Sequence, residues 1–281
     1  MNTADFDKIT FGYTYHEPGD GVGLYCLPAF EKLDFISHGF SARTGGVSDG
    51  FLSSLNLSFS RGFEPREKTM ENYRILCRAA GIEEDSMVMD TYEHGTTVRR
   101  VTALDRGCGW TRPSLPFCDG LITDDPAVTL MTGHADCMAF YFADPVKQAI
   151  GLAHAGWRGA LHRIGREMVR SMQEAFGSDP ADILAGVGPS ICPRCFEVGV
   201  DVADTFLDAF PCPEIRTEGK TGKAYIDLWK VAAMQFMEAG ILPEHISVMG
   251  ACTFEDTRLY SHRRDKGLTG GMSAFLRLKL D

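Results

Sequence analysis

The sequence predicts a single α/β domain built around a mixed sheet, and three patterns indicate this class. Compact apolar runs of strand length recur along the chain, segments of helical periodicity separate them, and glycine or proline marks most junctions. The 281 residues are 44% hydrophobic and 23% charged, which is enough apolar material for a sizeable core. We therefore expect residues 1–281 to form one unit, with residues 1–39 as its β-rich N-terminal part.

The first quarter of the chain alternates strands and turns before a helix begins. Residues 22–27 and 34–40 are rich in strand-forming side chains, and residues 43–50 form a loop with three glycines. Residues 67–80 place their apolar side chains on one helical face, and Gly81 supplies a stop. A helix packed against a sheet is the expected outcome.

The middle of the chain predicts the central strands. Residues 86–101 alternate apolar and polar side chains, with His94-Gly95 interrupting the pattern, and a glycine in such a place indicates a bulge or a close backbone approach. Four compact apolar runs follow, as expected for strands buried on both faces, with a turn at Asp144-Pro145. These runs are residues 121–123, 128–131, 138–142 and 149–153.

The period changes to that of a helix after Gly156. The helical stripe consists of Trp157, Leu161, Ile164, Met168 and Met172. Strands and helices then alternate to the end of the chain, which is the order of an α/β protein. We expect strands at residues 183–187, 246–249 and 273–278, and helices at residues 200–210 and 227–239, the latter ended by Gly240.

Charge and hydropathy argue against two classes of partner. The formal net charge is −10 with acidic residues spread along the chain, whereas binding a nucleic-acid backbone needs a basic face. No apolar run approaches the roughly 18 to 20 residues that span a bilayer, and residues 1–10 lack a basic stretch followed by an apolar one. We expect a cytoplasmic monomer or homodimer with no nucleic-acid or membrane partner.

The nine cysteines do not predict a disulfide scaffold. Their number is odd, the chain is long, and most lie in apolar runs, so buried reduced thiols are expected at Cys26, Cys77 and Cys252. Cys192 and Cys195 have CxxC spacing, but no second CxxC accompanies them and a Gly-Pro-Ser turn precedes them. The sequence therefore disfavours a redox or zinc role for this pair.

A thiol and an imidazole stand at matching ends of two adjacent apolar runs. Cys137 precedes one run, and His154, 17 residues later, ends the next, so both can point into a shared cleft. A thiolate and neutral imidazoles suit zinc or copper, and a catalytic zinc keeps three protein ligands. His94, at the glycine-marked break, is the candidate third ligand. His134 competes with it for that place or for a supporting one.

The same pair supports a second interpretation, a hydrolase that needs no metal. In that case His154 deprotonates Cys137 for nucleophilic attack. Asp136, beside the thiol, is able to orient an imidazole or to accept from a substrate hydroxyl, although turn capping is the commoner role of such an aspartate.

Two glycine-rich loops carry an arginine suited to an anion. Arg158 lies in the loop of residues 156–159, where a helix begins and its first N–H groups are unsatisfied. Arg43 lies in the loop of residues 43–50, where a guanidinium and flexible backbone resemble a phosphate or carboxylate clamp. Neither loop is a Walker A or GxGxxG sequence, so nucleoside triphosphates and dinucleotides are disfavoured.

Several segments together resemble the YfiH-type family, long labelled polyphenol oxidase or laccase-like and later described as purine nucleoside phosphorylase with adenosine deaminase activity. The similarity runs in order from about residue 40 to residue 278, and the His-Ala-Gly-Trp-Arg-Gly stretch is its most specific part. The segments are residues 44–48, 54–57, 94–95, 119–123, 135–137, 154–159, 188–191, 197–199, 227–228, 252–253 and 261–265.

The resemblance implies a fold, a metal site and an activity. The fold is similar to YfiH-like and cytotoxic-necrotizing-factor-type proteins. The metal is zinc, with copper as the alternative, held by His94, Cys137 and His154, which are also the expected catalytic residues. An arginine at the position of Arg43 lies near the metal cleft, where phosphate would contact it, and Arg158 at the helix start is the second expected phosphate contact from the residues themselves.

The activity that the resemblance implies is phosphorolysis of adenosine-type and inosine-type nucleosides by inorganic phosphate, with adenosine deamination beside it. Two alternatives stay open: a Cys-His amide hydrolase that edits peptidoglycan precursors, and a copper-dependent, laccase-like polyphenol oxidase. The chain departs from the family pattern at three places. Tyr92 and Glu93 precede His94 where the family has a glutamine, His134 stands where an acidic residue is common, and Gly270-Gly271 replaces a Gly-Arg pair.

Overall fold

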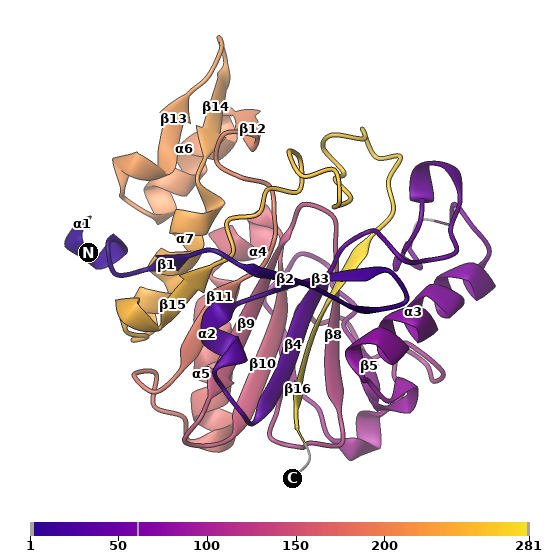
Figure 1. Ribbon diagram of the computed structural model, residues 1–281. Helices are drawn as coiled ribbons and strands as arrows, with labels where there is room; N and C mark the ends of the chain where they lie inside the picture. Colours follow the sequence, from indigo (N-terminus) through magenta and orange to yellow (C-terminus); the bar gives the residue numbers. More distant parts are fainter. Residues whose placement is uncertain (1–2, 61, 280–281) are drawn as a thin grey trace.

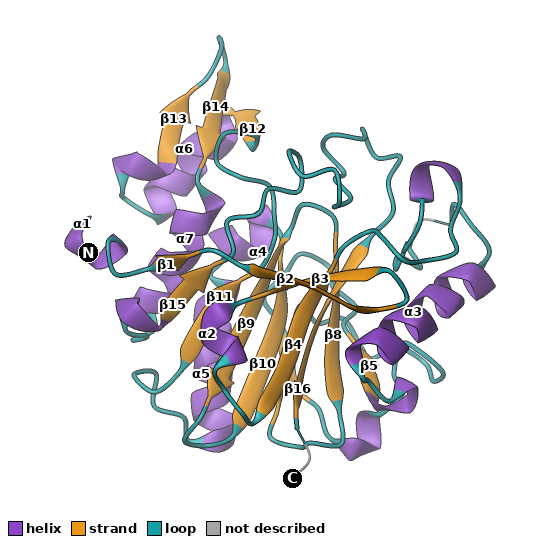
Figure 2. Ribbon diagram, viewed as in Figure 1, coloured by secondary structure: helices purple, strands orange, loops and turns teal. Residues whose placement is uncertain are grey.

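Two large sheets face each other in the computed structural model, which describes residues 3–60 and 62–279. Helices cover the outer face of each sheet, so the layers run helix, sheet, sheet, helix (Figure 1). A third, smaller sheet projects beside the seven-stranded one (Figure 2). The α/β class is as predicted, but the strands form three sheets where one mixed sheet was expected.

The seven-stranded sheet is mixed. In spatial order its strands are β1 (Thr10–Phe11), β15 (Ile246–Val248), β11 (Leu184–Val187), β9 (Met138–Asp144), β10 (Ala149–Ala155), β7 (Gly120–Thr123) and β6 (Val98–Arg100). The pairs β1–β15, β11–β15 and β6–β7 are parallel, and the other pairs are antiparallel. The carboxyl ends of β10, β11 and β15 therefore meet at one edge of the sheet, where β9 begins.

The six-stranded sheet is antiparallel apart from its last pair. In spatial order its strands are β2 (Thr14–Gly19), β3 (Val22–Cys26), β4 (Ile36–Ser41), β16 (Met272–Leu278), β8 (Thr129–His134) and β5 (Met87–Met89). The closing strand of the chain thus lies centrally, between β4 and β8. The small sheet, in the order β12 (Glu197–Gly199), β14 (Lys223–Ile226) and β13 (Arg216–Glu218), is antiparallel and was not predicted.

Strand alternation decides which side chains fill the space between the two large sheets. On β10, Ile150 and Leu152 point into this inter-sheet core, whereas Ala149 and Ala153 face the helices. Every residue of β9 and β10 is buried. This two-sided burial is what their continuous apolar sequences predict.

The helices follow from amphipathic segments that cover the sheets. The α-helices are α1 (Thr3–Phe6), α2 (Pro28–Glu31), α3 (Arg66–Ala80), α4 (Trp157–Leu161), α5 (Ile164–Phe176), α6 (Val200–Ala209) and α7 (Leu228–Glu238). Within the described ranges, five 3₁₀ turns lie at Gly50–Leu52, Glu84–Ser86, Ala103–Asp105, Pro213–Ile215 and Pro243–His245. Helix α3 covers the six-stranded sheet, and α5 and α7 cover the seven-stranded one (Figure 1). Among the described helices, none combines the length and apolar character that crossing a membrane requires.

Two predicted elements are wrong in their continuity. The single helix after Gly156 is two helices, because Arg163 adopts a left-handed conformation with φ of 64° and its guanidinium pairs with Glu238 of α7 at 2.8 Å. The interrupted strand at residues 86–101 is two strands in different sheets, β5 and β6. The segment around His94 is therefore a crossing from one sheet to the other.

A buried histidine in β4 makes the stability of this fold depend on pH. His38 packs between the rings of Phe30 and Tyr141, and its Nε2 accepts the N–H of Leu27 at 2.8 Å, as a neutral imidazole does. Burial lowers the pKa of His38 from 6.5 to about 4, although the nearby charge of Glu31 opposes this.

We expect His38→Gln to flatten the pH dependence of unfolding. The unfolded chain takes up the His38 proton near pH 6.5 and the folded chain only near pH 4, so stability falls as pH falls through this window, by about 3 kcal/mol in full. A glutamine oxygen can accept the same N–H without titrating. Urea unfolding of both proteins at about pH 7 and about pH 4.5 measures how far the free energy of unfolding changes between these pH values. An equal change in the two proteins would contradict the prediction.

Candidate functional site

Three candidate metal ligands converge at the edge where β9 begins and β10 ends. His94 lies in the crossing from β5 to β6, Cys137 lies in the turn from β8 to β9, and His154 lies near the end of β10. One ligand atom from each lies within 4.8 Å of the other two. Two crossings between the sheets and one strand end therefore bring together the three residues that the sequence singled out.

The pleat of the strands directs Cys137 and His154 to the same side. His154 pairs with Ala139 across the β9–β10 ladder and continues the face of Leu152, which points into the inter-sheet core. Cys137 precedes β9 on the face of Ala139 and Tyr141, which point into the same core. The site thus lies at the end of the inter-sheet core, where the apolar side chains on these strand faces give way to Cys137 and His154.

Asp119, directly before β7, holds two of the three ligands in place. Its carboxylate accepts the N–H of His94 and of Gly95 at 2.9 Å each, and that of Glu93 at 3.3 Å. The Nδ1 of His154 lies 3.3 Å from the same carboxylate. Asp119 therefore fixes the left-handed backbone of His94, with φ of 66°, and the ring of His154 together.

The electrostatics keep His154 neutral and Asp119 charged. Burial lowers the pKa of His154 and outweighs the opposing hydrogen bond to Asp119, and the neighbouring His94 lowers it further. Burial raises the pKa of Asp119, but the His154 hydrogen bond and the N–H groups of Gly95 and Glu93 prevail, so this pKa is lowered. An Nδ1–H directed at Asp119 leaves Nε2 of His154 as its metal-binding nitrogen.

His134 takes a supporting place rather than that of a ligand in this group. Its Nε2 lies 2.7 Å from the hydroxyl of Thr132, and its Nδ1 lies 3.1 Å from the carbonyl oxygen of Cys137. Burial lowers the pKa of His134 well below its ordinary value. With both ring nitrogens engaged, His134 buttresses the turn that carries the Cys137 thiol.

The donor set and the space around it fit zinc or copper. A thiolate and two imidazoles are the ligands that such metals prefer, and three protein ligands leave one position for a water or a substrate. Gly156 lies against all three ligands: a Cβ there would lie 2.5 Å from the His94 ring, 3.4 Å from the Cys137 sulfur and 3.5 Å from the His154 ring. Because glycine has no side chain, position 156 leaves room for the three ligands to converge.

Asp136 anchors loops instead of orienting an imidazole. Its carboxylate accepts the hydroxyl of Thr253 at 2.6 Å and the N–H of Arg263 at 2.7 Å. Its carbonyl oxygen accepts the N–H of Ile191 at 3.1 Å. The residue preceding Cys137 thus joins two distant loops to the turn that carries the thiol.

The two arginines expected to bind an anion already make contacts with the protein. The guanidinium of Arg43 donates to the carbonyl oxygens of Ser53 at 2.7 Å and Phe51 at 2.9 Å, and it stacks on the Tyr260 ring. The guanidinium of Arg158 is exposed at the beginning of α4 and stacks on Trp157. Neither arginine lines the cavity that Tyr92, His134 and Phe59 border.

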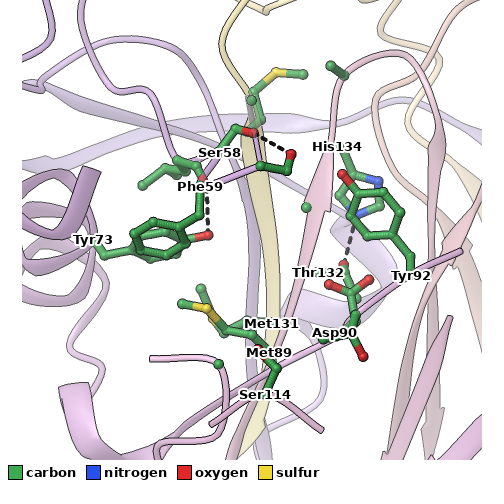
Figure 3. A pocket seen from close by; sticks show the side chains of 18 of the residues that line it. Ser58, Phe59, Tyr73, Met89, Asp90, Tyr92, Ser114, Met131, Thr132 and His134 are labelled. Carbon is green, nitrogen blue, oxygen red and sulfur yellow. Dashed lines mark hydrogen bonds between the residues drawn. The ribbon is translucent and has the colours of Figure 1, made fainter. Parts of the chain in front are cut away.

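A cavity of about 420 Å³ lies on the side of the six-stranded sheet, and its lining includes Tyr92 and His134 but none of the three candidate ligands. Figure 3 shows Tyr92 and His134 on one side of it and Phe59 and Tyr73 on the other. The Tyr92 ring stacks on His154 with centroids 4.1 Å apart, so one wall of the cavity contacts a candidate ligand. Phe59 and Tyr73 stack with planes 11° apart.

Asp90 is the acidic group in the lining of this cavity. One of its carboxyl oxygens, Oδ2, is buried without a hydrogen-bond partner. Burial raises the pKa of Asp90 well above its ordinary value, and the nearby charge of Asp119 raises it further, against an opposing N–H from Gly133. The raised pKa favours the neutral form of the Asp90 carboxyl group, and in that form it is able to donate a hydrogen bond.

Sequence reasoning did not single out Asp90 or Asp119 as functional residues. Asp90 directly follows the buried strand β5, and Asp119 directly precedes the buried strand β7. An acidic residue directly after or before a short, mostly apolar strand is the signal that the sequence offered. Strand ends carry site residues because the strands hold them rigidly at the rim of the core.

Gly156→Ala tests whether the three ligands form one metal site. The added methyl group collides with the His94 ring, so we expect zinc affinity to fall on the order of tenfold or more, as when ligand orientation is disturbed. Competition with a chromophoric chelator measures the affinity. Gly133→Ala is the matched control, because the nearest atom to its Cβ lies 3.6 Å away, and the prediction fails if both variants bind zinc equally.

Comparison with known proteins places this chain in a family. Residues 37–279 match the family model described as multi-copper polyphenol oxidoreductase laccase. Purine nucleoside phosphorylase YlmD of Bacillus subtilis is 37% identical over 86% of this chain and 88% of its own. Purine nucleoside phosphorylase of Deinococcus radiodurans is also 37% identical, over 86% of this chain and 89% of its own.

Solved structures agree with the sequence matches. YlmD of Geobacillus stearothermophilus superposes with a TM-score of 0.87 at 33% identity, covering 95% of this chain and 99% of that one. The hypothetical protein YfiH of Bacillus licheniformis gives a TM-score of 0.87 at 30% identity, covering 94% and 99%. The family expected from the sequence motifs is confirmed: the chain belongs to the multi-copper polyphenol oxidoreductase laccase family, together with YfiH and YlmD.

Proposed function

We propose that this protein is a zinc-dependent purine nucleoside phosphorylase acting on adenosine-type and inosine-type nucleosides, with adenosine deamination as a second activity. The observation that carries the proposal is that Tyr92, in the wall of a cavity of nucleoside size, stacks on His154 of the three-ligand group. The names of the relatives in Bacillus and Deinococcus support the same activity.

The residues that would hold the zinc are His94, Cys137 and His154, with Asp119 as the outer partner of His154. When bound there, zinc supplies a Lewis acid and lowers the pKa of a bound water toward about 7, the chemistry that deamination of adenosine needs. The chain itself keeps the imidazole of His154 neutral and oriented, and Gly156 keeps the space beside it open.

Asp90 is the proposed proton donor to the departing purine. In phosphorolysis a phosphate oxygen forms a bond to C1′ of the ribose as the bond from C1′ to the purine nitrogen breaks, and electrons pass onto the base. A neutral carboxylic acid facing the cavity is able to protonate a purine ring nitrogen as this charge develops. The aromatic walls hold the base by stacking.

Arg43 and Arg158 remain the proposed phosphate contacts from the sequence, and the cavity adds Arg66. The Arg66 guanidinium stacks on the Phe59 ring at 4.1 Å and lines the cavity. All three are able to bind phosphate oxygens through forked N–H donors. Their effects on the KM for phosphate, measured in single alanine variants, would rank them.

A second candidate function is a Cys-His amide hydrolase, and one observation favours it. Asp119 contacts one side of the His154 imidazole and the Cys137 thiol lies near the ring, as in a catalytic triad in which a carboxylate orients the imidazole that activates a thiol. Such an enzyme would cleave an amide, as in a peptidoglycan precursor, without phosphate and without metal. Activity that survives metal chelation would distinguish it from the phosphorylase.

A copper-dependent polyphenol oxidase is less consistent with the ligands. The four-electron reduction of oxygen needs several copper centres with histidine-rich ligand sets. Of the three groups of described residues able to hold a metal, the site of His94, Cys137 and His154 alone contains two histidines. Oxygen uptake with phenolic substrates by the copper-loaded protein would support this alternative.

Cys137→Ala should remove both zinc at this site and phosphorolysis. We expect the purified protein to release the base from adenosine and inosine only when phosphate is present, and the variant to lose at least about 100-fold in rate because the third ligand is gone. Base release followed by chromatography and metal analysis are the measurements. Cys212→Ser, which removes a thiol outside the cavity, is the control.

The outcomes separate the three functions. Full phosphorolysis and full zinc content in the Cys137→Ala variant would refute the assignment. Amide cleavage that needs no phosphate and resists chelation would favour the hydrolase, and oxygen uptake would favour the oxidase.

Asp90→Asn should weaken catalysis and change its pH profile. An amide occupies the same space but cannot transfer a proton, so we expect kcat to fall on the order of 100-fold. The unmodified enzyme loses activity as pH rises through the raised pKa of Asp90, because the carboxyl must be protonated, and the variant lacks this alkaline limb. If the alkaline limb of the pH–activity profile is unchanged in the variant, another group causes that limb.

A further inference from the structure

We propose that Cys192, Cys195, Cys252 and Glu255 form a second metal site, a structural zinc centre on the loops that follow β11 and β15. These loops leave two parallel neighbouring strands at the same edge of the sheet. An isolated bridge between Ser190 and Cys252 extends the pairing beyond the strands. The topology therefore brings the CxxC pair to a third thiol far along the chain.

The side-chain geometry is close to that of a tetrahedral centre. The ligand atoms of the four residues all lie within 4.8 Å of one another. Zinc–sulfur bonds of about 2.3 Å in a tetrahedron place the sulfurs about 3.8 Å apart, so closure onto the ion needs movements of about 1 Å or less. The sulfur of Cys195 already lies 3.6 Å from a carboxylate oxygen of Glu255.

The surroundings suit a closed, negatively charged centre. Cys192 and Cys252 are buried, and the N–H of Cys192 donates to the sulfur of Cys252 at 3.3 Å. On the solvent side, the guanidinium of Arg194 binds both oxygens of Glu255, at 3.0 and 3.2 Å. Three thiolates, a carboxylate and a divalent ion together carry a net charge of −2. The N–H group of Cys192 and the guanidinium of Arg194 offset this charge.

The ligand types select the metal and the role. Thiolates favour zinc, copper(I) or iron–sulfur clusters, whereas a carboxylate oxygen beside them favours zinc over copper(I). Four protein ligands leave no open position, which is the mark of a structural site. None of the four residues lines the cavity beside His154.

The proposal departs from the sequence interpretation of the CxxC pair. It disfavoured a zinc or redox role because no second CxxC accompanies Cys192 and Cys195. The structure places Cys252, expected only as a buried reduced thiol, against that pair and adds Glu255. Cys252 is buried as predicted, but its neighbours change what it is able to do.

The centre would support the turn that carries Cys137. The N–H of Ile191 and the hydroxyl of Thr253, each next to one of the proposed ligands, both bind Asp136. An ion joining the two loops would hold these donors at a fixed separation. Loss of the ion would therefore loosen the anchorage of the turn without removing any residue of the three-ligand site.

Metal analysis of single variants tests the proposal. After chelator treatment and saturation with zinc, we expect about two equivalents per chain in the unmodified protein, and about one in Cys195→Ser and in Cys137→Ala. Glu255→Gln, an exposed and conservative change, should retain the second ion with at least about tenfold weaker affinity. Cys212→Ser is the matched control, because its thiol also lies beside a carboxylate, that of Glu214, but outside any of the groups able to hold a metal.

Two further readouts keep the result decisive. Cobalt substituted for zinc should give thiolate charge-transfer absorption that falls by more than half in Cys195→Ser, because three of the four cobalt–sulfur bonds belong to this centre. Cys192, Cys195 and Cys252 should resist alkylation until a chelator is added. If a reductant, and not a chelator, makes these three thiols open to alkylation, they form a disulfide and the proposal is overturned. A content of one zinc per chain that is lost only in Cys137→Ala would also overturn it.

Discussion

The candidate site depends on one buried carboxylate. Asp119 accepts the backbone N–H groups of Glu93, His94 and Gly95 and faces Nδ1 of His154. Each hydrogen bond to a charged group contributes on the order of 1.5–3 kcal/mol, and together these bonds offset the several kcal/mol that burying a carboxylate costs. Because the same group fixes the backbone of one ligand and the ring of another, it joins the crossing segment to the end of β10.

The face-to-face sheets explain why the site lies where it does. Apolar side chains such as Leu152 and Tyr141 fill the space between the sheets, and the same strand faces end in His154 and Cys137. The cavity opens beside these ends, on the side of the six-stranded sheet, where β5 and β8 lie next to each other. A rigid double layer thus presents a few reactive groups at its rim, and short crossings supply the rest.

Local sequence patterns predicted much of this arrangement, and long-range pairing accounts for what they missed. Strand alternation and the hairpin between the two runs were enough to place Cys137 near His154, and the glycine-marked break identified His94. The break could not reveal that the chain changes sheets there. Sequence periodicity indicates which side chains are buried, but it does not indicate which strand lies beside which. Nothing local connects Cys192 to Cys252, because only the parallel pairing of β11 and β15 brings their loops together.

The same edge of the seven-stranded sheet carries both groups of ligands, and this has a mechanical consequence. The carboxyl ends of β10, β11 and β15 meet there, so the loops that carry Cys252 and Ile191 lie against the turn that carries Cys137, with Asp136 between them. A displacement of about 1 Å at a reacting centre can cost about 100-fold in rate. A four-coordinate ion bound by Cys192, Cys195, Cys252 and Glu255 would fix the separation of the loops that anchor this turn. A cross-link at this edge is therefore useful to the chemistry although it takes no part in it, since its ligands lie outside the cavity lining.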